Sequence, residues 1–485
     1  MSRMSGALPD RNEIPTCHGG LADLNEEYDY AIDSIEGELP RDLRGTFLRN
    51  GPGRQTIGGT PFGHWFDGDG MLAAFSFGEQ GVRFRNRYVR TPKYVEETAA
   101  GRILYRGFGT QIPGGLLKNL LRAPANPANT HVIYHAGHLL ALNEGGRPWE
   151  VAADTLETLG EFDYDGALQG KTFSAHGKID PGSGDYINFG TGIKMRGLRP
   201  PQPCLNLYRI DPAGRMATTN QLLLDTFPFC HDFALSARHG VFFINSIVIG
   251  DMTGFLLGRH SLSDGIRFDS GQSMRVLVVD LETLQLVREI ETDPGAIIHF
   301  GNAFEEGDEL VVDAMHTADF DANTTLTNVF SPDAHFGGGE YRRYRINLKT
   351  GGLVFERRSE NESEFPTFNP AFSGRSSAAG YSACSIPNGA DSFFNAIQRV
   401  DDSGTRLVTL PPGCYGSEPV FAAATGATRE DDGYLLEVVY DGYRNLSELQ
   451  IYRADAIDER VCTLTLRHHL PHQFHGYFTS QIPAA

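Results

Sequence analysis

The sequence lacks the patterns that mark several common classes of protein. Its six cysteines are scattered with no C-x-x-C pair, which excludes a zinc knuckle or a dense disulfide framework and favours a reducing compartment. No stretch reaches the ~18 consecutive apolar residues that a membrane-spanning helix needs. The N-terminal region also lacks the apolar core of a signal peptide. We therefore expect a soluble protein of the cytoplasm.

Positive charge and nucleotide-binding motifs are scarce as well. The 42 Lys and Arg residues are outnumbered by 61 Asp and Glu residues, and the formal net charge of −19 argues against the basic face that binds DNA or RNA. There is no G-x-S-x-G elbow of a hydrolase and no G-x-G-x-x-G turn of a dinucleotide-binding domain. We expect no nucleic-acid partner.

Glycine and short hairpins dominate what the sequence does contain. Its 56 glycines indicate many turns. One hairpin pattern, an apolar strand, a polar turn and a second strand, recurs at residues 148–164, 205–222, 275–291, 343–359 and 449–466. Other hairpins fall between these copies, and two hairpins per repeat make the four-stranded blade of a β-propeller. We predict an all-β, seven-bladed β-propeller forming a single domain over residues 1–485, with residues 1–38 as an N-terminal arm.

Four of the sixteen histidines share a local context, in which the histidine lies against Gly, Asp or Phe beside an apolar run. They are His176, His231, His299 and His475. Their spacings of 55, 68 and 176 residues exclude a local motif such as H-E-x-x-H. The inner strands of different propeller blades converge on one axis, however, and neutral imidazoles that meet there suit Fe, Cu, Zn or Ni. Four unrelated buried histidines are the alternative, and spacing alone does not decide between the two.

Glutamates in otherwise apolar or Gly- and Pro-rich stretches are candidates to support such a site. Carboxylates commonly accept the outer N–H of metal-binding imidazoles, which fixes the tautomer and the orientation of the ring. Glu144, Glu364 and Glu418 lie in stretches of this kind. Most glutamates in proteins are simply solvated, and these three could equally end strands.

Ordered motifs along nearly the whole chain resemble those of the carotenoid cleavage oxygenase family. They include GTFLRNGPG (45–53), GHWFDGDGML (63–72), FCHDFALS (229–236), EFPTFNP (364–370) and FHGYF (474–478). The resemblance implies a seven-bladed propeller with a loop and helix cap over the metal-site end, formed by insertions that include about residues 100–127.

The same resemblance implies an iron-dependent dioxygenase. It assigns the four histidines to one Fe(II) per chain and the three glutamates to the outer N–H groups of the imidazoles. The reaction would cleave a conjugated carbon–carbon double bond with O2 as co-substrate and give aldehyde products. Thr130 matches a threonine beside the iron, and Phe66 matches a position near the substrate tunnel. No catalytic side chain other than the metal ligands is expected.

One segment bears on the substrate. The run FGTQIPGG (108–115) and the Leu-rich stretch after it resemble the bacterial branch that cleaves apocarotenoids to retinal. The leucines recur at helical spacing and could form one apolar face that touches a membrane, or a short helix packed on the propeller. They are Leu116, Leu117, Leu120 and Leu121.

Other functions remain open on the sequence. One is cleavage of stilbenoids or phenylpropenes on the same fold. Stilbene-cleaving relatives are expected to carry a lysine in the H-x-G-K turn, where this chain has His138. A metal-dependent isomerase or hydrolase and a non-enzymatic propeller scaffold are further alternatives.

Overall fold

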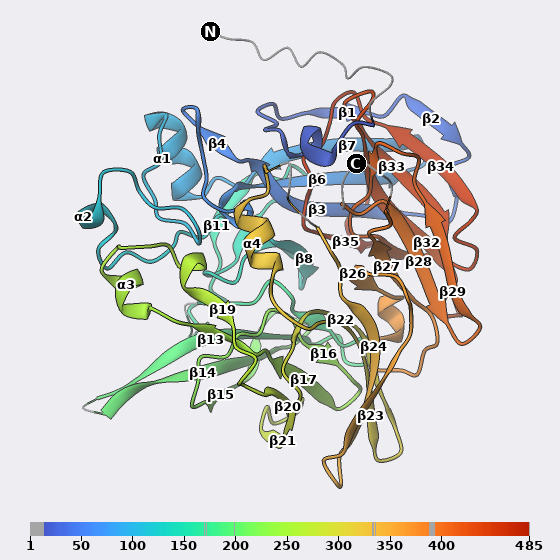
Figure 1. Ribbon diagram of the computed structural model, residues 1–485. Helices are drawn as coiled ribbons and strands as arrows, with labels where there is room; N and C mark the ends of the chain where they lie inside the picture. Colours follow the sequence, from blue (N-terminus) through green and yellow to red (C-terminus); the bar gives the residue numbers. More distant parts are fainter. Residues whose placement is uncertain are drawn as a thin grey trace.

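Seven sheets surround a common axis in the computed structural model (Figure 1). The structure describes residues 14–484 except 169, 171, 198, 332, 333, 335 and 388–392. Within these residues the strands of each large sheet pair antiparallel, as in a seven-bladed β-propeller, which confirms the predicted fold. That residues 1–485 form one domain with an arm over residues 1–38 stays a prediction, and residues 1–13 of that arm lie outside the described residues.

The first four blades occupy the N-terminal part of the ring, together with one strand from near the C-terminus. Blade 1 holds β1 (Asp29–Ala31), β7 (Gly81–Tyr88), β6 (Asp69–Gly78), β3 (Gly45–Arg54) and β35 (His475–Thr479). Blade 2 holds β8 (His131–His135), β9 (His138–Leu142), β10 (Trp149–Val151) and β11 (Thr158–Glu161). Blade 3 holds β12 (Lys178–Ile179), β13 (Tyr186–Arg196), β14 (Arg199–Ile210) and β15 (Met216–Leu223). Blade 4 holds β16 (Ala234–Leu235), β17 (His239–Ile244), β20 (Met274–Asp280) and β21 (Leu286–Thr292).

The last three blades complete the ring. Blade 5 holds β22 (Ala296–Glu306), β23 (Glu309–Thr317), β24 (Glu340–Asn347) and β25 (Leu353–Arg357). Blade 6 holds β26 (Ser363–Thr367), β27 (Gly380–Cys384), β28 (Ala396–Asp401) and β29 (Gly404–Thr409). Blade 7 holds β30 (Cys414–Tyr415), β31 (Val420–Ala423), β32 (Gly433–Asp441), β33 (Leu446–Arg453), β34 (Arg460–Thr465) and β2 (Ser34–Gly37). Two small hairpins stand apart, β4 (Thr56–Ile57) with β5 (Thr60–Pro61) and β18 (Ile247–Ile249) with β19 (Ile266–Phe268).

The repeated hairpin of the sequence has one structural position. All five copies form the third and fourth strands from the axis of their blades, namely β10–β11, β14–β15, β20–β21, β24–β25 and β33–β34. The inner strands of neighbouring blades contact one another, as β35 does with β8 and β22 does with β16 and β26. Residues at the start of each inner strand therefore face a common centre.

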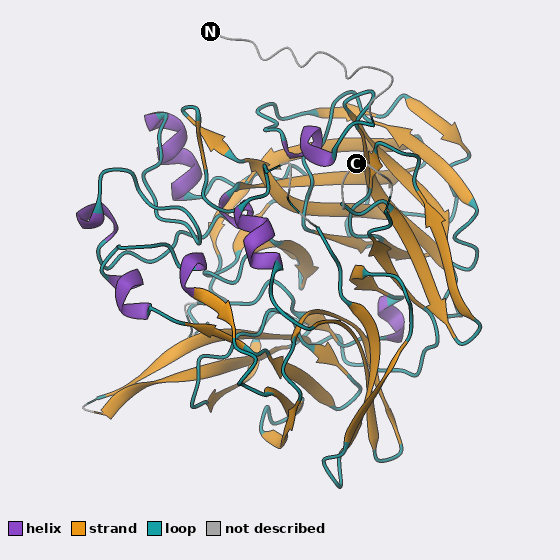
Figure 2. Ribbon diagram, in the orientation of Figure 1, coloured by secondary structure: helices purple, strands orange, loops and turns teal. Residues whose placement is uncertain are grey.

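Helices occupy the connections between strands (Figure 2). The described residues form α1 (Pro92–Ala100), α2 (Leu116–Asn119), α3 (Met252–Leu256) and α4 (Ala322–Thr327), with the 3₁₀ turns η1 (Cys17–Leu21), η2 (Trp65–Asp67), η3 (Ser263–Gly265) and η4 (Pro370–Phe372). The buried Asp67 carboxylate accepts hydrogen bonds from Phe108 N (2.5 Å), Gly109 N (2.9 Å) and Thr110 Oγ1 (2.7 Å). These bonds hold the segment 100–127 onto η2.

The leucine-rich stretch is less helical than its spacing suggests. Helix α2 ends at Asn119, so Leu120 and Leu121 lie beyond it. Leu121 has a left-handed backbone, with φ 55°, and its N–H donates to Leu256 O of α3 (2.8 Å) instead of to a carbonyl one turn earlier. The bond to the neighbouring helix replaces the bond that would have continued α2. The expected single helical face is therefore wrong, although all four leucines remain exposed.

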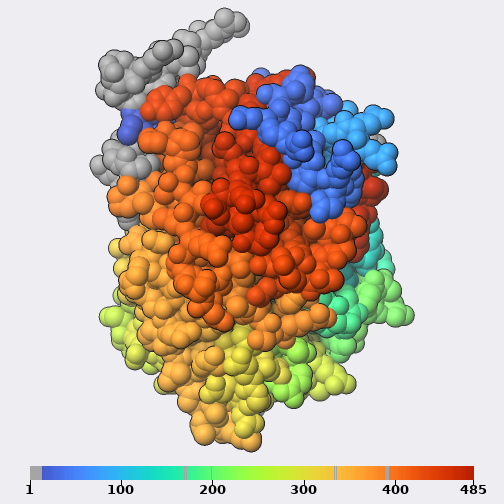
Figure 3. Space-filling model, turned by 90° about the vertical axis from the view of Figure 1, so that its right-hand side faces the viewer, coloured from blue at the N-terminus to red at the C-terminus, as the bar shows by residue number. Residues whose placement is uncertain are grey.

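A strand from near each end of the chain closes the ring. Strands β3 and β35 pair antiparallel, with Asn50 opposite His475. Strands β1 and β2 from the preceding segment join β7 of blade 1 and β34 of blade 7. Figure 3 shows the N-terminal part (blue) lying against the C-terminal part (red) on the surface.

Candidate metal centre

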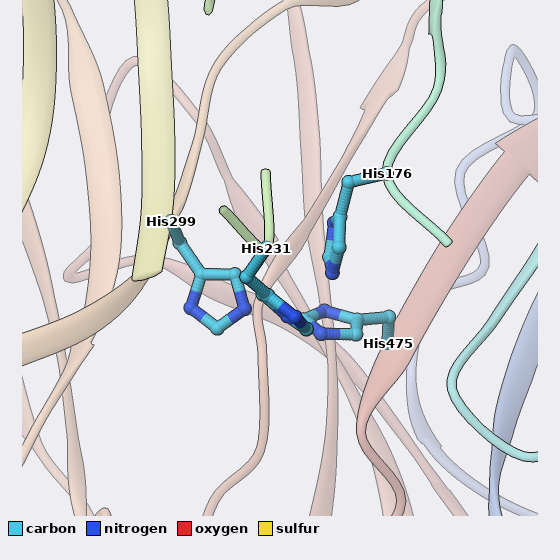
Figure 4. A group of neighbouring side chains, drawn as sticks. All are labelled: His176, His231, His299 and His475. Atoms are coloured by element: carbon cyan, nitrogen blue, oxygen red, sulfur yellow. The ribbon is translucent and has the colours of Figure 1, made fainter. Parts of the chain in front are cut away.

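Four histidines meet where the inner strands begin. His176 and His231 lie shortly before β12 and β16, His299 lies in β22, and His475 is the first residue of β35. Their ligand nitrogens all lie within 4.8 Å of one another. The four rings direct their nitrogens toward a common point (Figure 4). Blades 3, 4, 5 and 1 each supply one ring, which explains the wide spacing of these histidines along the chain.

The three predicted glutamates each bond one of these histidines. His231 Nδ1 donates to Glu144 Oε1. His299 Nδ1 donates to Glu364 Oε2 (2.7 Å), and His475 Nδ1 donates to Glu418 Oε1 (2.9 Å). A neutral ring that donates from Nδ1 presents the lone pair of Nε2 on its other side.

Two of the inner nitrogens have the properties expected of metal ligands. His176 Nε2 and His299 Nε2 are buried and have no hydrogen-bond partner among the described residues. A buried polar atom without a partner costs free energy, and native proteins rarely leave one in that state. Four imidazole donors with free lone pairs fit a divalent transition metal.

The pKa values of the site histidines depend on burial and on their carboxylate neighbours. Burial and the neighbouring histidines hold the pKa of His176 and of His475 well below the usual value. Burial opposes charge on His231 too, but the contact with Glu144 outweighs burial and raises the pKa of His231 while lowering that of Glu144. Burial raises the pKa of Glu418. His176 and His475 are thus neutral, the form in which imidazole binds metals.

A fully buried arginine supports the Glu418–His475 pair. Arg49 of β3 is 0% exposed, and its Nη1 donates to Glu418 O (3.0 Å) and Glu418 Oε2 (3.5 Å). Its Nη2 donates to Gln473 O (3.1 Å), two residues before His475. Arg49 was not predicted from the sequence, although a charged residue inside the apolar stretch GTFLRNGPG is a usable signal.

Thr130 and Phe66 are connected to the cluster only through neighbouring residues. Thr130 directly precedes β8, and its Oγ1 accepts a hydrogen bond from Asn143 Nδ2 (3.0 Å). Phe66 of η2 packs edge-on against Phe474, with centroids 5.3 Å apart, next to His475. Their roles beside the metal and the substrate stay predictions.

The ring of Phe365 packs against the histidine cluster, a position that was not predicted from the sequence. Its ring lies 5.2 Å from that of His299 and 5.5 Å from that of His475, between centroids. Its φ is 56°, a left-handed conformation that costs a bulky residue roughly 1–2 kcal/mol. Its N–H donates to Glu364 Oε2 (2.9 Å). A residue before proline is expected to be extended, so the sequence predicted an extended backbone at Phe365 instead of a left-handed one.

His138 does not face the cluster. In the β8–β9 hairpin it pairs with His135 at the turn, whereas His131 pairs with Leu142 at the other end. Four residues of strand separate the two ends, about 13 Å. His138 Nδ1 instead contacts Glu150 Oε1 of β10 (2.5 Å). His138 is therefore directed at a neighbouring strand, and whether its identity bears on a stilbenoid substrate stays a prediction.

Comparisons with known proteins agree with this geometry. The family model described as RPE65, retinal pigment epithelial membrane protein, matches residues 21–480. Apocarotenoid-15,15'-oxygenase from Synechocystis is 33% identical over 94% of both chains. Isoeugenol monooxygenase from Pseudomonas nitroreducens is 28% identical over 96% of this chain and 98% of its own.

A solved structure, cobalt-substituted Synechocystis apocarotenoid oxygenase, superposes with a TM-score of 0.86 at 31% identity. It covers 95% of this chain and 98% of its own. The scaffold alternative finds no support in these relatives, which are named as oxygenases. The chain belongs to the carotenoid cleavage oxygenase family.

Proposed function

We propose that the protein is a non-haem Fe(II) dioxygenase that cleaves a conjugated double bond of an apocarotenoid or carotenoid to retinal-like aldehydes. The observation that carries this proposal is the cluster of four histidines with inward nitrogens, three of them bonded to glutamate. His176, His231, His299 and His475 would hold one iron per chain. Iron(II), when bound, would supply the activation of O2 that the oxidative cleavage needs.

The protein's own groups position and enclose this chemistry. Glu144, Glu364 and Glu418 fix the tautomer and direction of three rings. Phe365 packs against the histidine rings, and Phe66 and Phe474 belong to the same aromatic cluster, which suits a polyene. The described site residues offer no nucleophile paired with a base, so the proposed reaction uses no covalent intermediate with a side chain.

The substrate class follows from the relatives and from one segment. Apocarotenoid-15,15'-oxygenase matches nearly the full length of the chain, and FGTQIPGG resembles that branch. A stilbenoid or phenylpropene substrate is the alternative, favoured by the full-length match to isoeugenol monooxygenase.

Turnover tests the proposal directly. Protein loaded with Fe(II) is incubated in air with an apocarotenal, 4-hydroxystilbene or isoeugenol, and products are identified by LC–MS with an anaerobic control. We expect an O2-dependent, shortened aldehyde from the apocarotenal, lost in His299→Ala and kept in the control His138→Ala. Cleavage of an aromatic substrate alone would replace the apocarotenoid assignment. No turnover by protein shown to hold iron would overturn the dioxygenase proposal.

Exposed leucines support a peripheral contact with a membrane, from which a polyene would be taken up. Leu117 and Leu121 are 87% and 72% exposed, and Leu256 and Leu257 beside them are about 40% exposed. Leu116 and Leu120 belong to the same patch. No helix formed by the described residues has the length and apolar character to cross a bilayer. Six cysteines scattered without a C-x-x-C pair are consistent with the proposed cytoplasmic location.

Vesicle binding tests this contact. Full burial of a leucine contributes about 1.5–3 kcal/mol, so Leu117→Ser with Leu121→Ser is expected to weaken binding to phosphatidylcholine vesicles at least tenfold. Leu159→Ser is the matched control, because Leu159 is 62% exposed on β11 of blade 2. Equal binding by all three proteins in a flotation assay would contradict the proposal.

A further inference from the structure

His176 differs from the other three histidines of the centre. No carboxylate among the described residues bonds its ring, whereas each of the others donates to a glutamate. A metal-binding imidazole usually needs a partner to fix its direction. Something other than a carboxylate must therefore hold His176.

A fifth histidine lies against His176. His131, the first residue of β8, has its ring nearly parallel to that of His176, with an interplanar angle of 14° and centroids 5.7 Å apart. It also lies edge-on to His475 at 5.6 Å. Blade 2 thus contributes an imidazole to the cluster in addition to the four rings from blades 1, 3, 4 and 5.

The nitrogens of His131 face the main chain on both sides. Nδ1 lies 2.8 Å from Ala175 O, the carbonyl bonded to the nitrogen of His176. Nε2 lies 3.2 Å from Gly476 O, the residue after His475. Both nitrogens face carbonyl oxygens, to one of which a neutral ring donates, so neither nitrogen is directed at the space between the four inner rings. His131 is therefore not a fifth ligand.

The main chain of His131 is fixed as well. Asn50 Nδ2 donates to His131 O (2.8 Å) and to Ala128 O (3.0 Å). Asn50 is buried in β3 and lies opposite His475 in β35. The main chain of His131 is thus held from blade 1, and its ring contacts the segments that carry His176 and His475.

We infer that His131 is a positioning residue that orients His176, as the glutamates orient the other three rings, by binding Ala175 O and packing flat on the His176 ring. This inference rests on the proposed metal site. It predicts that the nitrogens of His131, and not only its bulk, determine how tightly the centre holds a metal.

The test measures metal binding instead of turnover. Co(II) affinity is determined by competition with a chromophoric chelator, and the d–d absorption spectrum is recorded for the wild type and for His131→Phe. We expect about 10–100-fold weaker binding and an altered spectrum in His131→Phe, with the unfolding temperature of the metal-free protein nearly unchanged. His135→Phe is the matched control, because His135 lies on the same strand and bonds Gly184 O (3.1 Å) away from the centre.

A second pair of variants decides the matter if His131→Phe does not fold. The amide nitrogen of asparagine can take the position of Nδ1 and donate to Ala175 O, whereas that of glutamine lies nearer the position of Nε2, so His131→Asn should retain more affinity than His131→Gln. Equal affinity and an unchanged spectrum in every variant would overturn the inference, and so would an equal loss in His135→Phe. A wild type that binds no Co(II) would instead overturn the proposed metal site itself.

Discussion

Two buried carboxylates close to Arg49 differ in their surroundings. Glu418 bonds Arg49 and His475. Glu437 of β32 is fully buried, and burial raises its pKa to about 8, against the opposing effect of the nearby Arg49 charge. At neutral pH Glu437 is therefore mostly a neutral acid, which leaves the charge of Arg49 available to Glu418.

Replacing Glu437 by glutamine tests this protonation state. The folded pKa of about 8 lies above the ordinary value of 4.5, so the contribution of Glu437 to stability is full below pH 4.5 and is lost as the pH rises to 8. Glu437→Gln mimics the neutral acid and lacks this loss. Its stability relative to the wild type should grow by roughly a few kcal/mol over that range, since one pKa unit is about 1.4 kcal/mol.

Thermal unfolding at several pH values measures the difference. Glu79→Gln, in the exposed turn between β6 and β7, is the control and should follow the wild type. A difference in unfolding temperature between Glu437→Gln and the wild type that stays constant from pH 5 to pH 8 would show that Glu437 is ionised in the fold.

The sequence could indicate the four histidines and the three glutamates because each stands out in an apolar or glycine-rich stretch and matches a family motif. His131 could not be found that way. Its ring contacts main-chain carbonyls, and a carbonyl 44 or 345 residues from His131 comes opposite that ring only through blade packing. Phe365 was hidden by a local rule for residues before proline that the bond to Glu364 overrides.

At the scale of elements, a buried ionic network attaches α1 to blade 1. Lys93 Nζ contacts Asp69 Oδ1 (2.9 Å) and Glu97 Oε2 (3.3 Å), and Arg54 contacts Asp69 from the other side (2.7 Å). Glu97 Oε1 accepts the N–H groups of Leu104 (2.8 Å) and Tyr105 (2.9 Å), where the segment 100–127 begins. The network therefore anchors this segment as well as α1.

Lys93→Met should destabilise the fold strongly. Removing one partner of a buried ion pair leaves uncompensated charge and typically costs about 3–5 kcal/mol. Arg90→Met removes the exposed pair with Glu27 (2.8 Å) just before the same helix and should cost less than about 1 kcal/mol. Denaturant unfolding compares the two, and similar losses would mean that the buried network adds no more than a surface pair.

Strands and helices were predicted correctly where the same polar turn recurred along the sequence, and wrongly where tertiary contacts determined where an element ends. The five outer hairpins were visible because each has apolar alternation around a polar turn. The equivalent hairpin of blade 6, β28–β29, was not recognised from the sequence. The leucine segment was expected to be one helical face, and the bond from Leu121 to α3 ends the helix early.

At the scale of the whole molecule, the candidate metal centre brings together residues from several blades of the ring. Its four histidines come from blades 1, 3, 4 and 5, and Glu418 comes from blade 7. A ligand that binds only the folded state stabilises it by about 2.7 kcal/mol when present at 100 times its dissociation constant. Metal binding should therefore stabilise the propeller as a unit.

Unfolding temperatures with and without Fe(II) or Co(II) test this. We expect the metal to raise the unfolding temperature of the wild type and of His138→Ala, whose ring contacts Glu150 away from the centre. His475→Ala should show little or no such rise. A metal-dependent rise that persists in His475→Ala would place the binding site elsewhere.

The position of His475 on β35 also sets the order of events during synthesis. His176, His231 and His299 leave the ribosome long before His475. Strand β3 is synthesised more than 400 residues before β35, one of the two strands that pair with it. The full set of four ligands cannot exist on a nascent chain until residue 475 has emerged. Binding of a metal by all four proposed ligands must then follow the synthesis of residue 475, and a chain interrupted earlier would lack the fourth of them.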